Sequence, residues 1–168
     1  MKSRPIPFLL SCAFAAAWAL YLVSVHNAAI GETLSPSVLC GPEGGCGAVL
    51  ASDWSTIFGV AVSAPAVPMY LLLLALGIGG KLGNERLSSL ATLCGLGGAI
   101  FGGWLLYQML GVVGTLCRYC LVMDAANLAV LATGAALHPE GVGGAAKGVL
   151  AAAARVFKPG PEGSLIPA

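Results

Sequence analysis

The sequence LCRYC at residues 116–120 opens an apolar segment that continues to Leu137. A second cysteine pair, Cys40 and Cys46, lies in the one long polar loop of the chain, from His26 to Thr56. Cysteines three residues apart on a helix share one face, as a reversible CxxC disulfide requires. Two dithiols at the ends of apolar segments indicate electron transfer between thiols and an acceptor in the lipid.

The composition sets the class of protein. The 168 residues are 58% hydrophobic and only 9% charged, and their mean hydropathy is +0.90. So much apolar surface exceeds what one soluble core can bury, and so few charges do not keep a chain in solution. The net charge of +1 gives no basic surface for a nucleic acid. The composition therefore predicts an integral membrane protein with no nucleic-acid partner.

Several apolar segments are long enough to cross a bilayer core of about 30 Å at about 1.5 Å per residue. We expect four spanning helices and a fold that is all-α, a transmembrane four-helix bundle with a long extracytoplasmic loop between helices 1 and 2. The first segment follows Lys2 and Arg4 as a signal peptide would, but its apolar core is longer than the roughly 7–15 residues of such signals. The segments are Ile6 to Val25, Ile57 to Gly80, Leu90 to Leu110 and Leu116 to Leu137.

The basic residues predict the orientation, because loops rich in Lys and Arg stay in the cytoplasm. Only Arg118 falls on the side of the cysteine pairs, which places those pairs in an oxidising compartment where disulfides persist. Both termini are then cytoplasmic. We expect a transmembrane domain over residues 1–140 and a loosely ordered or interfacial cytoplasmic tail over 141–168. The basic residues on the cytoplasmic side are Lys2, Arg4, Lys81, Arg86, Lys147, Arg155 and Lys158.

The residues around the CxxC pair favour a reactive thiol. A turn over Gly111 to Thr115 would precede the last helix, with Thr115 as its N-cap and Cys117 in its first turn. Unpaired backbone N–H groups, the helix dipole and the charge of Arg118 each lower the pKa of a cysteine there.

The same helix face continues to Asp124 and Asn127. An acid and an amide in an apolar helix must face a bundle interior or a cavity rather than lipid. They form either one wall of a buried site or hydrogen bonds that only hold neighbouring helices together.

Cys40 and Cys46 bracket a flexible glycine-rich run at residues 41–45, so they can approach within disulfide distance. A disulfide there closes a very short ring and constrains little, which favours an exchange role over a structural one. Cys12 and Cys94 lie inside apolar segments and are expected to be small core residues. The four loop and CxxC cysteines are not expected to bind zinc, because they face an oxidising compartment and have no histidine near them.

Several other features bear on the architecture. Trp54 and Phe58 suit either a ligand site or an interfacial aromatic belt. Pro65 and Pro68 are expected to kink the second segment. In the third segment Gly98 and Gly102 form a GxxxG face, and Trp104, Tyr107 and Gln108 approach the end beside the dithiol.

The order of these motifs resembles the bacterial branch of the vitamin K epoxide reductase family over about residues 6 to 137. It consists of the loop cysteine pair, then Ser-x-Trp-x-x-x-Phe-Gly at residues 52–59, then Leu-Cys-x-x-Cys at the head of the last helix. The resemblance implies a four-helix bundle around a quinone, capped by the loop. It also implies that Cys117 and Cys120 are the active-site pair, with Cys120 nearest the quinone and Cys117 exchanging with the loop.

The resemblance further implies that Cys40 and Cys46 shuttle electrons from a thioredoxin-like periplasmic oxidant to the CxxC pair. Here that partner is expected to be a separate protein, because the tail is too short for a fused thioredoxin-like domain. The acceptor is expected to be ubiquinone or menaquinone in the inner membrane of a bacterium. The residues expected to contact it are Ser52, Trp54, Phe58, Tyr107, Asp124 and Asn127.

The chain also departs from the family pattern. Asp124 stands where the vertebrate enzyme has a quinone-contacting tyrosine, and the second segment shows no equivalent of that enzyme's asparagine. Epoxide and warfarin chemistry are therefore not transferred to this chain.

Three other functions would use the cysteines in different ways. A quinone-coupled oxidase of the DsbB type would carry its CxxC in the first outer loop and its spaced pair in the second, the reverse of the order here. A non-enzymatic tetraspan protein would use a Cys40–Cys46 disulfide only as a staple. A conduit carrying cytoplasmic electrons outward would need cysteines within the membrane, where only Cys12 and Cys94 lie.

Overall fold

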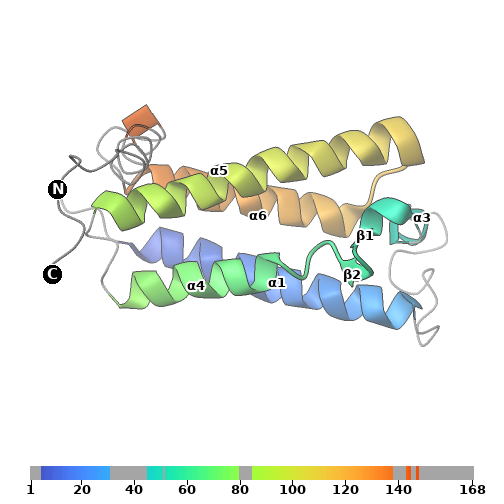
Figure 1. Ribbon diagram of the computed structural model, residues 1–168, viewed down its shortest axis with the longest axis horizontal. Helices are drawn as coiled ribbons and strands as arrows, with labels where there is room; N and C mark the ends of the chain where they lie inside the picture. Colours follow the sequence, from blue (N-terminus) through green and yellow to red (C-terminus); the bar gives the residue numbers. More distant parts are fainter. Residues whose placement is uncertain are drawn as a thin grey trace, which may run out of the picture.

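The computed structural model describes residues 5–30, 45–50, 52–79, 85–137, 143–144 and 147. Its longer helices run in alternating directions, so that the start of α1 and the end of α6 lie at the same end of the bundle (Figure 1). The opposite end carries short elements between α1 and α4 together with the beginning of α6 (Figure 1). The longer helices are α1 (Ile6–Ile30), α4 (Ala66–Ile78), α5 (Glu85–Gln108) and α6 (Arg118–Ala135).

The short elements form a cap at that end. They are the helix α3 (Cys46–Leu50), a 3-10 turn η1 (Asp53–Ser55) and the strands β1 (Thr56–Ile57) and β2 (Val60–Ala61). The strands pair antiparallel, with Thr56 opposite Ala61. The two turn residues, Phe58 and Gly59, both have positive φ, as a tight hairpin whose twist matches its strands requires. This hairpin is the one departure from an all-helical fold within the described residues.

The helices pack mainly in three pairs: α1 with α4, α1 with α6, and α5 with α6. Small residues on α1, among them Ala15 and Ala19, are fully buried and let its neighbours approach closely. Large apolar side chains point outward on every long helix, for example Leu10, Ile78 and Ile100. A helix surface that is apolar on its outside suits lipid rather than water. The larger members of the core are Phe8, Tyr70, Leu73 and Val130.

Within the part of the chain that the structure describes, two helices are long and apolar enough to cross a membrane, Ile6–Ala28 and Leu87–Val113. The helix α4 is also apolar but has only 13 residues. The chain is therefore mostly helical with two candidate spans, and the number of four spans remains a prediction.

The second predicted segment, Ile57 to Gly80, is not one helix. Residues 56–61 form the hairpin, and α4 begins only at Ala66, with Pro65 as its N-cap. Pro65 and Pro68 lie at the start of the helix, where a proline needs no backbone N–H because that position has no intrahelical acceptor. The prediction that they kink the segment was wrong: they begin the helix.

The turn before α6 also differs from the prediction. The residues Met109–Val113 continue α5 as a π-helix, η3, which ends at Gly114 in the left-handed conformation. The N-cap of α6 is Cys117 rather than Thr115, because the Cys117 sulfur accepts a hydrogen bond from the backbone N–H of Cys120. The reactive cysteine thus lies just before the helix and caps it.

Some predictions fall outside the described residues. They concern all of residues 31–44, Cys40 included, and nearly all of the tail over 141–168.

Candidate functional site

The two sulfurs of the CxxC pair lie next to each other. Cys117 and Cys120 are both free thiols, and the Cys120 thiol donates to Cys117 Sγ across 2.6 Å. The Cys120 backbone N–H donates to the same sulfur across 3.3 Å. The hydrogen bond from the Cys120 side chain, helped by backbone N–H groups, lowers the pKa of Cys117 to about 7, although burial opposes this shift. Cys117 is therefore the thiolate of the pair near neutral pH.

A loop cysteine packs directly on this thiolate. Cys46, at the start of α3, forms one buried cluster with Met109 and Cys117. Cys46 is disulfide-bonded, whereas the cysteines of the CxxC pair are not. The loop cysteine and the first CxxC cysteine thus belong to one buried cluster, each 1% exposed.

A close approach of the Gly45 backbone to a side chain makes this contact possible. Gly45 lies against the side chain of Thr115, and a Cβ built on Gly45 would overlap it. Only a residue without a side chain lets α3 settle on the turn that leads into Cys117.

A cavity of about 370 Å³ opens on the other side of the pair. Its wall is mostly apolar and comes from α1, the cap, α4, α5, η3 and α6, with Leu22, Met69, Phe101 and Met123 among its residues. Cys120 lines this cavity, and Cys117 does not. The two sulfurs of the CxxC pair therefore face different surroundings, the first toward the loop and the second toward the cavity.

The two polar residues predicted beyond the CxxC pair both line the cavity, and they differ in their partners. Asn127 is tied to two other helices: its Oδ1 accepts from the Tyr70 hydroxyl and its Nδ2 donates to the carbonyl of Gly98 across 3.2 Å. Asn127 therefore holds neighbouring helices together, which is one of the two roles that the sequence predicts for it. Asp124 has a buried Oδ2 without a hydrogen-bond partner among the described residues. It lies against Gly102 of α5, where an added Cβ would meet its Oδ1.

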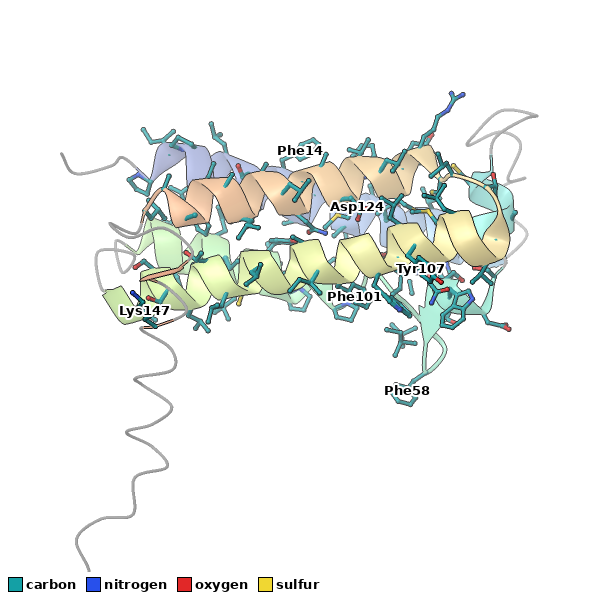
Figure 2. All side chains as sticks on the ribbon, turned by 90° about the horizontal axis from the view of Figure 1, so that it is seen from above. Phe14, Phe58, Phe101, Tyr107, Asp124 and Lys147 are labelled. Carbon is teal, nitrogen blue, oxygen red and sulfur yellow. The ribbon has the colours of Figure 1, made fainter. Side chains whose placement is uncertain are left out.

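The other expected ligand residues divide into two groups. Ser52 and Trp54 line the cavity. Ser52 Oγ donates to the carbonyl of Val49 across 2.6 Å. The structure does not bring Phe58 or Tyr107 to the cavity wall. Phe58 is 102% exposed and Tyr107 is 67% exposed, and Phe58 points away from the bundle in Figure 2.

Sequence reasoning missed several polar residues of the wall as ligand candidates, namely His26, Ser55, Ser63 and Tyr70. His26 is only 3% exposed, although it was assigned to the boundary of a polar loop. The sequence holds one indication of this burial: His26 is an ionisable residue less than one helical turn beyond the first apolar segment. Tyr70 carries no such signal, because a tyrosine in an apolar segment is ordinarily a core residue.

The remaining cysteines do not take part in the site. Cys12 is fully buried in the core and Cys94 packs against that core. Both are free thiols, and neither lines the cavity. Among the described residues, no group of three or more His, Cys, Asp or Glu side chains is placed to hold a metal ion.

One hydrogen bond fixes the CxxC turn to α1. The Trp18 indole N–H donates to the carbonyl of Tyr119 across 3.0 Å, and the rings of these two residues lie 5.9 Å apart. This carbonyl lies between the two cysteines, so α1 holds the backbone that sets their spacing.

Comparison with protein families gives one match. The model described as "Vitamin K epoxide reductase family" matches residues 6–134. Comparisons with curated proteins and with solved structures gave no match.

Proposed function

Since this chain belongs to the vitamin K epoxide reductase family, we propose that it oxidises an extracytoplasmic thioredoxin-like protein and passes the electrons through two cysteine pairs to a quinone. Membership makes the chain a membrane thiol–disulfide oxidoreductase. The partner, the acceptor and the path between them are the proposal.

The placement of the two CxxC sulfurs carries this proposal. Cys117 is buried with the loop residue Cys46, while Cys120 lines the cavity. Thiol–disulfide exchange needs an attacking thiolate in contact with the sulfur that it attacks. Cys117 is therefore placed for exchange with the loop, and Cys120 for reaction with an acceptor in the cavity.

The cavity fits a quinone ring. Its volume of about 370 Å³ lies within the roughly 300–1,000 Å³ of ordinary small-molecule sites. Apolar residues dominate the wall, and two buried polar atoms on it, His26 Nε2 and Asp124 Oδ2, have no partner within the described part of the chain. A bound quinone supplies an acceptor for two electrons and two protons.

The residues then have distinct roles. Cys40 and Cys46 take electrons from the partner, and Cys117 forms the mixed disulfide with the loop. Cys120 donates electrons toward the cavity, which Ser52, Trp54, Asp124 and Asn127 help to form. The direction depends on the acceptor, since each 30 mV of potential difference is worth about 1.4 kcal/mol for two electrons.

The proposed setting is the inner membrane of a bacterium, with both termini in the cytoplasm and both cysteine pairs in the periplasm. The structure supports one part of this orientation, because α3 and the start of α6 lie at the same end of the bundle (Figure 1). Ubiquinone and menaquinone are both proposed acceptors.

The test is quinone reduction by the purified protein with a reduced thioredoxin-like partner, followed by quinone absorbance. We expect the double variant Cys12→Ala/Cys94→Ala to keep its activity and Cys120→Ala to lose it. A wild-type protein that leaves both ubiquinone and menaquinone oxidised would refute the proposal.

A further inference from the structure

We propose that His26 and Asp124 bind the two carbonyl oxygens of the quinone ring, one residue to each oxygen. This inference rests on the proposed function and adds the polar contacts that orient the quinone in the cavity. It assigns a binding role to His26, which lies at the far end of the apolar part of α1 and far from the CxxC pair in the sequence.

His26 has an unmet hydrogen bond inside the cavity wall. The residue is 3% exposed, its side chain lines the cavity, and its Nε2 has no partner among the described residues. Burying a polar atom without a hydrogen bond costs free energy on the order of 1–3 kcal/mol. A ligand that accepts or donates at this nitrogen would remove that cost.

Asp124, on α6, has an unmet hydrogen bond within the described residues, as His26 on α1 does. Its Oδ2 is buried, lacks a partner in the described ranges and belongs to a residue of the cavity wall. Its other oxygen, Oδ1, lies where a Cβ added to Gly102 of α5 would overlap it, so α5 leaves room for this carboxyl group only because position 102 is glycine.

Several other polar groups of the wall already have partners, and only His26 Nε2 and Asp124 Oδ2 are fully buried side-chain atoms without one among the described residues. Asn127 is bonded to Tyr70 and Gly98, and Ser52 Oγ donates to a backbone carbonyl. Ser55 Oγ likewise donates to the carbonyl of Leu50. The unmet hydrogen bonds are therefore concentrated on one imidazole and one carboxyl group.

These two groups match the chemistry of a quinone. A quinone ring is apolar apart from two carbonyl oxygens, which are hydrogen-bond acceptors. An imidazole N–H and a carboxylic acid O–H are both donors, and an apolar wall with a few placed donors is the usual construction of such a site.

Asp124 also has a place in the proton balance. Counted from two protonated thiols, formation of the Cys117–Cys120 disulfide creates one S–S bond and releases two electrons and two protons, one when Cys117 ionises and one from Cys120. The two O–H bonds of a quinol take up the same number of each. Asp124 lies one helical turn beyond Cys120 on the same face. Its carboxyl group is therefore placed to hold a proton released at Cys120 and to give it to the adjacent ring oxygen.

The test measures binding of a short-chain ubiquinone to the full-length protein in detergent, by quenching of tryptophan fluorescence. We expect His26→Phe and Asp124→Leu each to weaken binding roughly fivefold to tenfold, because each removes one hydrogen bond. His26→Gln retains an N–H donor and should restore part of the loss. Asn27→Ala, a change of the exposed neighbour, should bind as the wild type does.

A second measurement can overturn the inference from the wild-type protein alone, whether or not the variants fold. In the infrared spectrum of the wild-type complex, both quinone carbonyl bands should lie below their frequencies in detergent alone. One band should return toward the free value in His26→Phe and the other in Asp124→Leu. A wild-type complex with either band at the free frequency would overturn the inference.

The outcomes separate this inference from the proposed function. If the wild type binds and reduces the quinone while His26→Phe binds equally tightly, the function stands and the role of His26 is refuted. If Gln108→Leu weakens binding and His26→Phe does not, Gln108 is the second anchor instead. If the wild type neither binds nor reduces a quinone, both proposals fail.

Discussion

The hydroxyl of Tyr70 donates a hydrogen bond to Oδ1 of Asn127, and this contact joins α4 to α6 at the wall of the cavity. The same amide donates to the carbonyl of Gly98 on α5. Three helices are thus fastened at one side chain. This matters because α4 and α5 otherwise have few contacts with each other.

Replacement of this amide should loosen the bundle. In Asn127→Ala the Tyr70 hydroxyl and the Gly98 carbonyl lose their partner, and we expect a loss of about 1–3 kcal/mol in the free energy of unfolding. Tyr70→Phe removes one donor only and should cost about 0.5–1.5 kcal/mol. Unfolding in detergent measures both, with Leu128→Ala, on the exposed face of the same helix, as the control. Equal stability of Asn127→Ala and the control would contradict a fastening role.

A side chain at position 45 should separate the two cysteine pairs. In Gly45→Ala the new Cβ overlaps Thr115, so α3 must move away from Cys117. We expect the rate of electron transfer from the thioredoxin-like partner to fall tenfold or more while quinone binding is unchanged. Thr115→Gly in the same chain should recover much of the rate. An unchanged rate in Gly45→Ala would show that this close approach is not needed for exchange.

The glycines of α5 offer a matched pair. Gly102→Ala places a Cβ against the Asp124 carboxyl group, whereas Gly103→Ala meets nothing within 4 Å. Gly102→Ala should weaken quinone binding severalfold. Gly103→Ala should bind normally and gain about 0.5–1 kcal/mol of stability, because alanine restricts the unfolded chain more than glycine does. Similar quinone binding by both variants would show that the contact between Gly102 and Asp124 does not affect quinone affinity.

The ionisation of Cys117 should have its midpoint near pH 7 rather than at the ordinary value of 9.0. Thiolate absorbance in the ultraviolet measures this in a Cys12→Ala/Cys94→Ala background, with Cys117→Ser as the blank. Cys120→Ala removes the largest cause of the shift and should raise the pKa of Cys117 toward 9.0. A midpoint that stays near pH 7 in that variant would assign the shift to backbone N–H groups instead.

The lowered pKa of Cys117 makes the stability of the folded chain depend on pH. Ionised Cys117 stabilises the folded chain, and this contribution is fully present above pH 9 and is lost as the pH falls through about 7. The Cys117→Ser variant should therefore differ from the wild type more at pH 9 than at pH 6.

Phe58 should be dispensable for the ligand. Its φ of 53° lies in the left-handed region, where a side chain costs about 1–2 kcal/mol, and its ring is fully exposed. Phe58→Gly should therefore raise the stability in detergent by about 1 kcal/mol and leave quinone binding unchanged. Weaker quinone binding by this variant would show that the hairpin tip contacts the ligand after all.

The sequence was most informative where a physical rule links neighbouring residues. The CxxC spacing and the stripe from Cys120 through Asp124 to Asn127 follow from helix periodicity, and the structure places all three on the cavity wall. The family resemblance was likewise confirmed by the match over residues 6–134.

Features that depend on distant contacts could not be predicted. The approach of Gly45 to Thr115 and the bond from Tyr70 to Asn127 join residues more than 50 positions apart. The sequence did not predict Cys117 as the N-cap of α6, because cysteine is not a usual capping residue. Its sulfur accepts the capping hydrogen bond only after ionisation is favoured. The second segment was misjudged because hydropathy does not separate an apolar hairpin from the start of an apolar helix.

The burial of Cys117 has a consequence for survival in an oxidising compartment. A thiolate at neutral pH is ordinarily the first group that peroxide attacks, and the sulfinic and sulfonic acids that follow are irreversible for most proteins. Cys117 is only 1% exposed, beneath the packed side chain of Cys46. The helix that delivers the exchanging sulfur therefore also shields the nucleophile, so that it meets another cysteine before it meets a damaging oxidant.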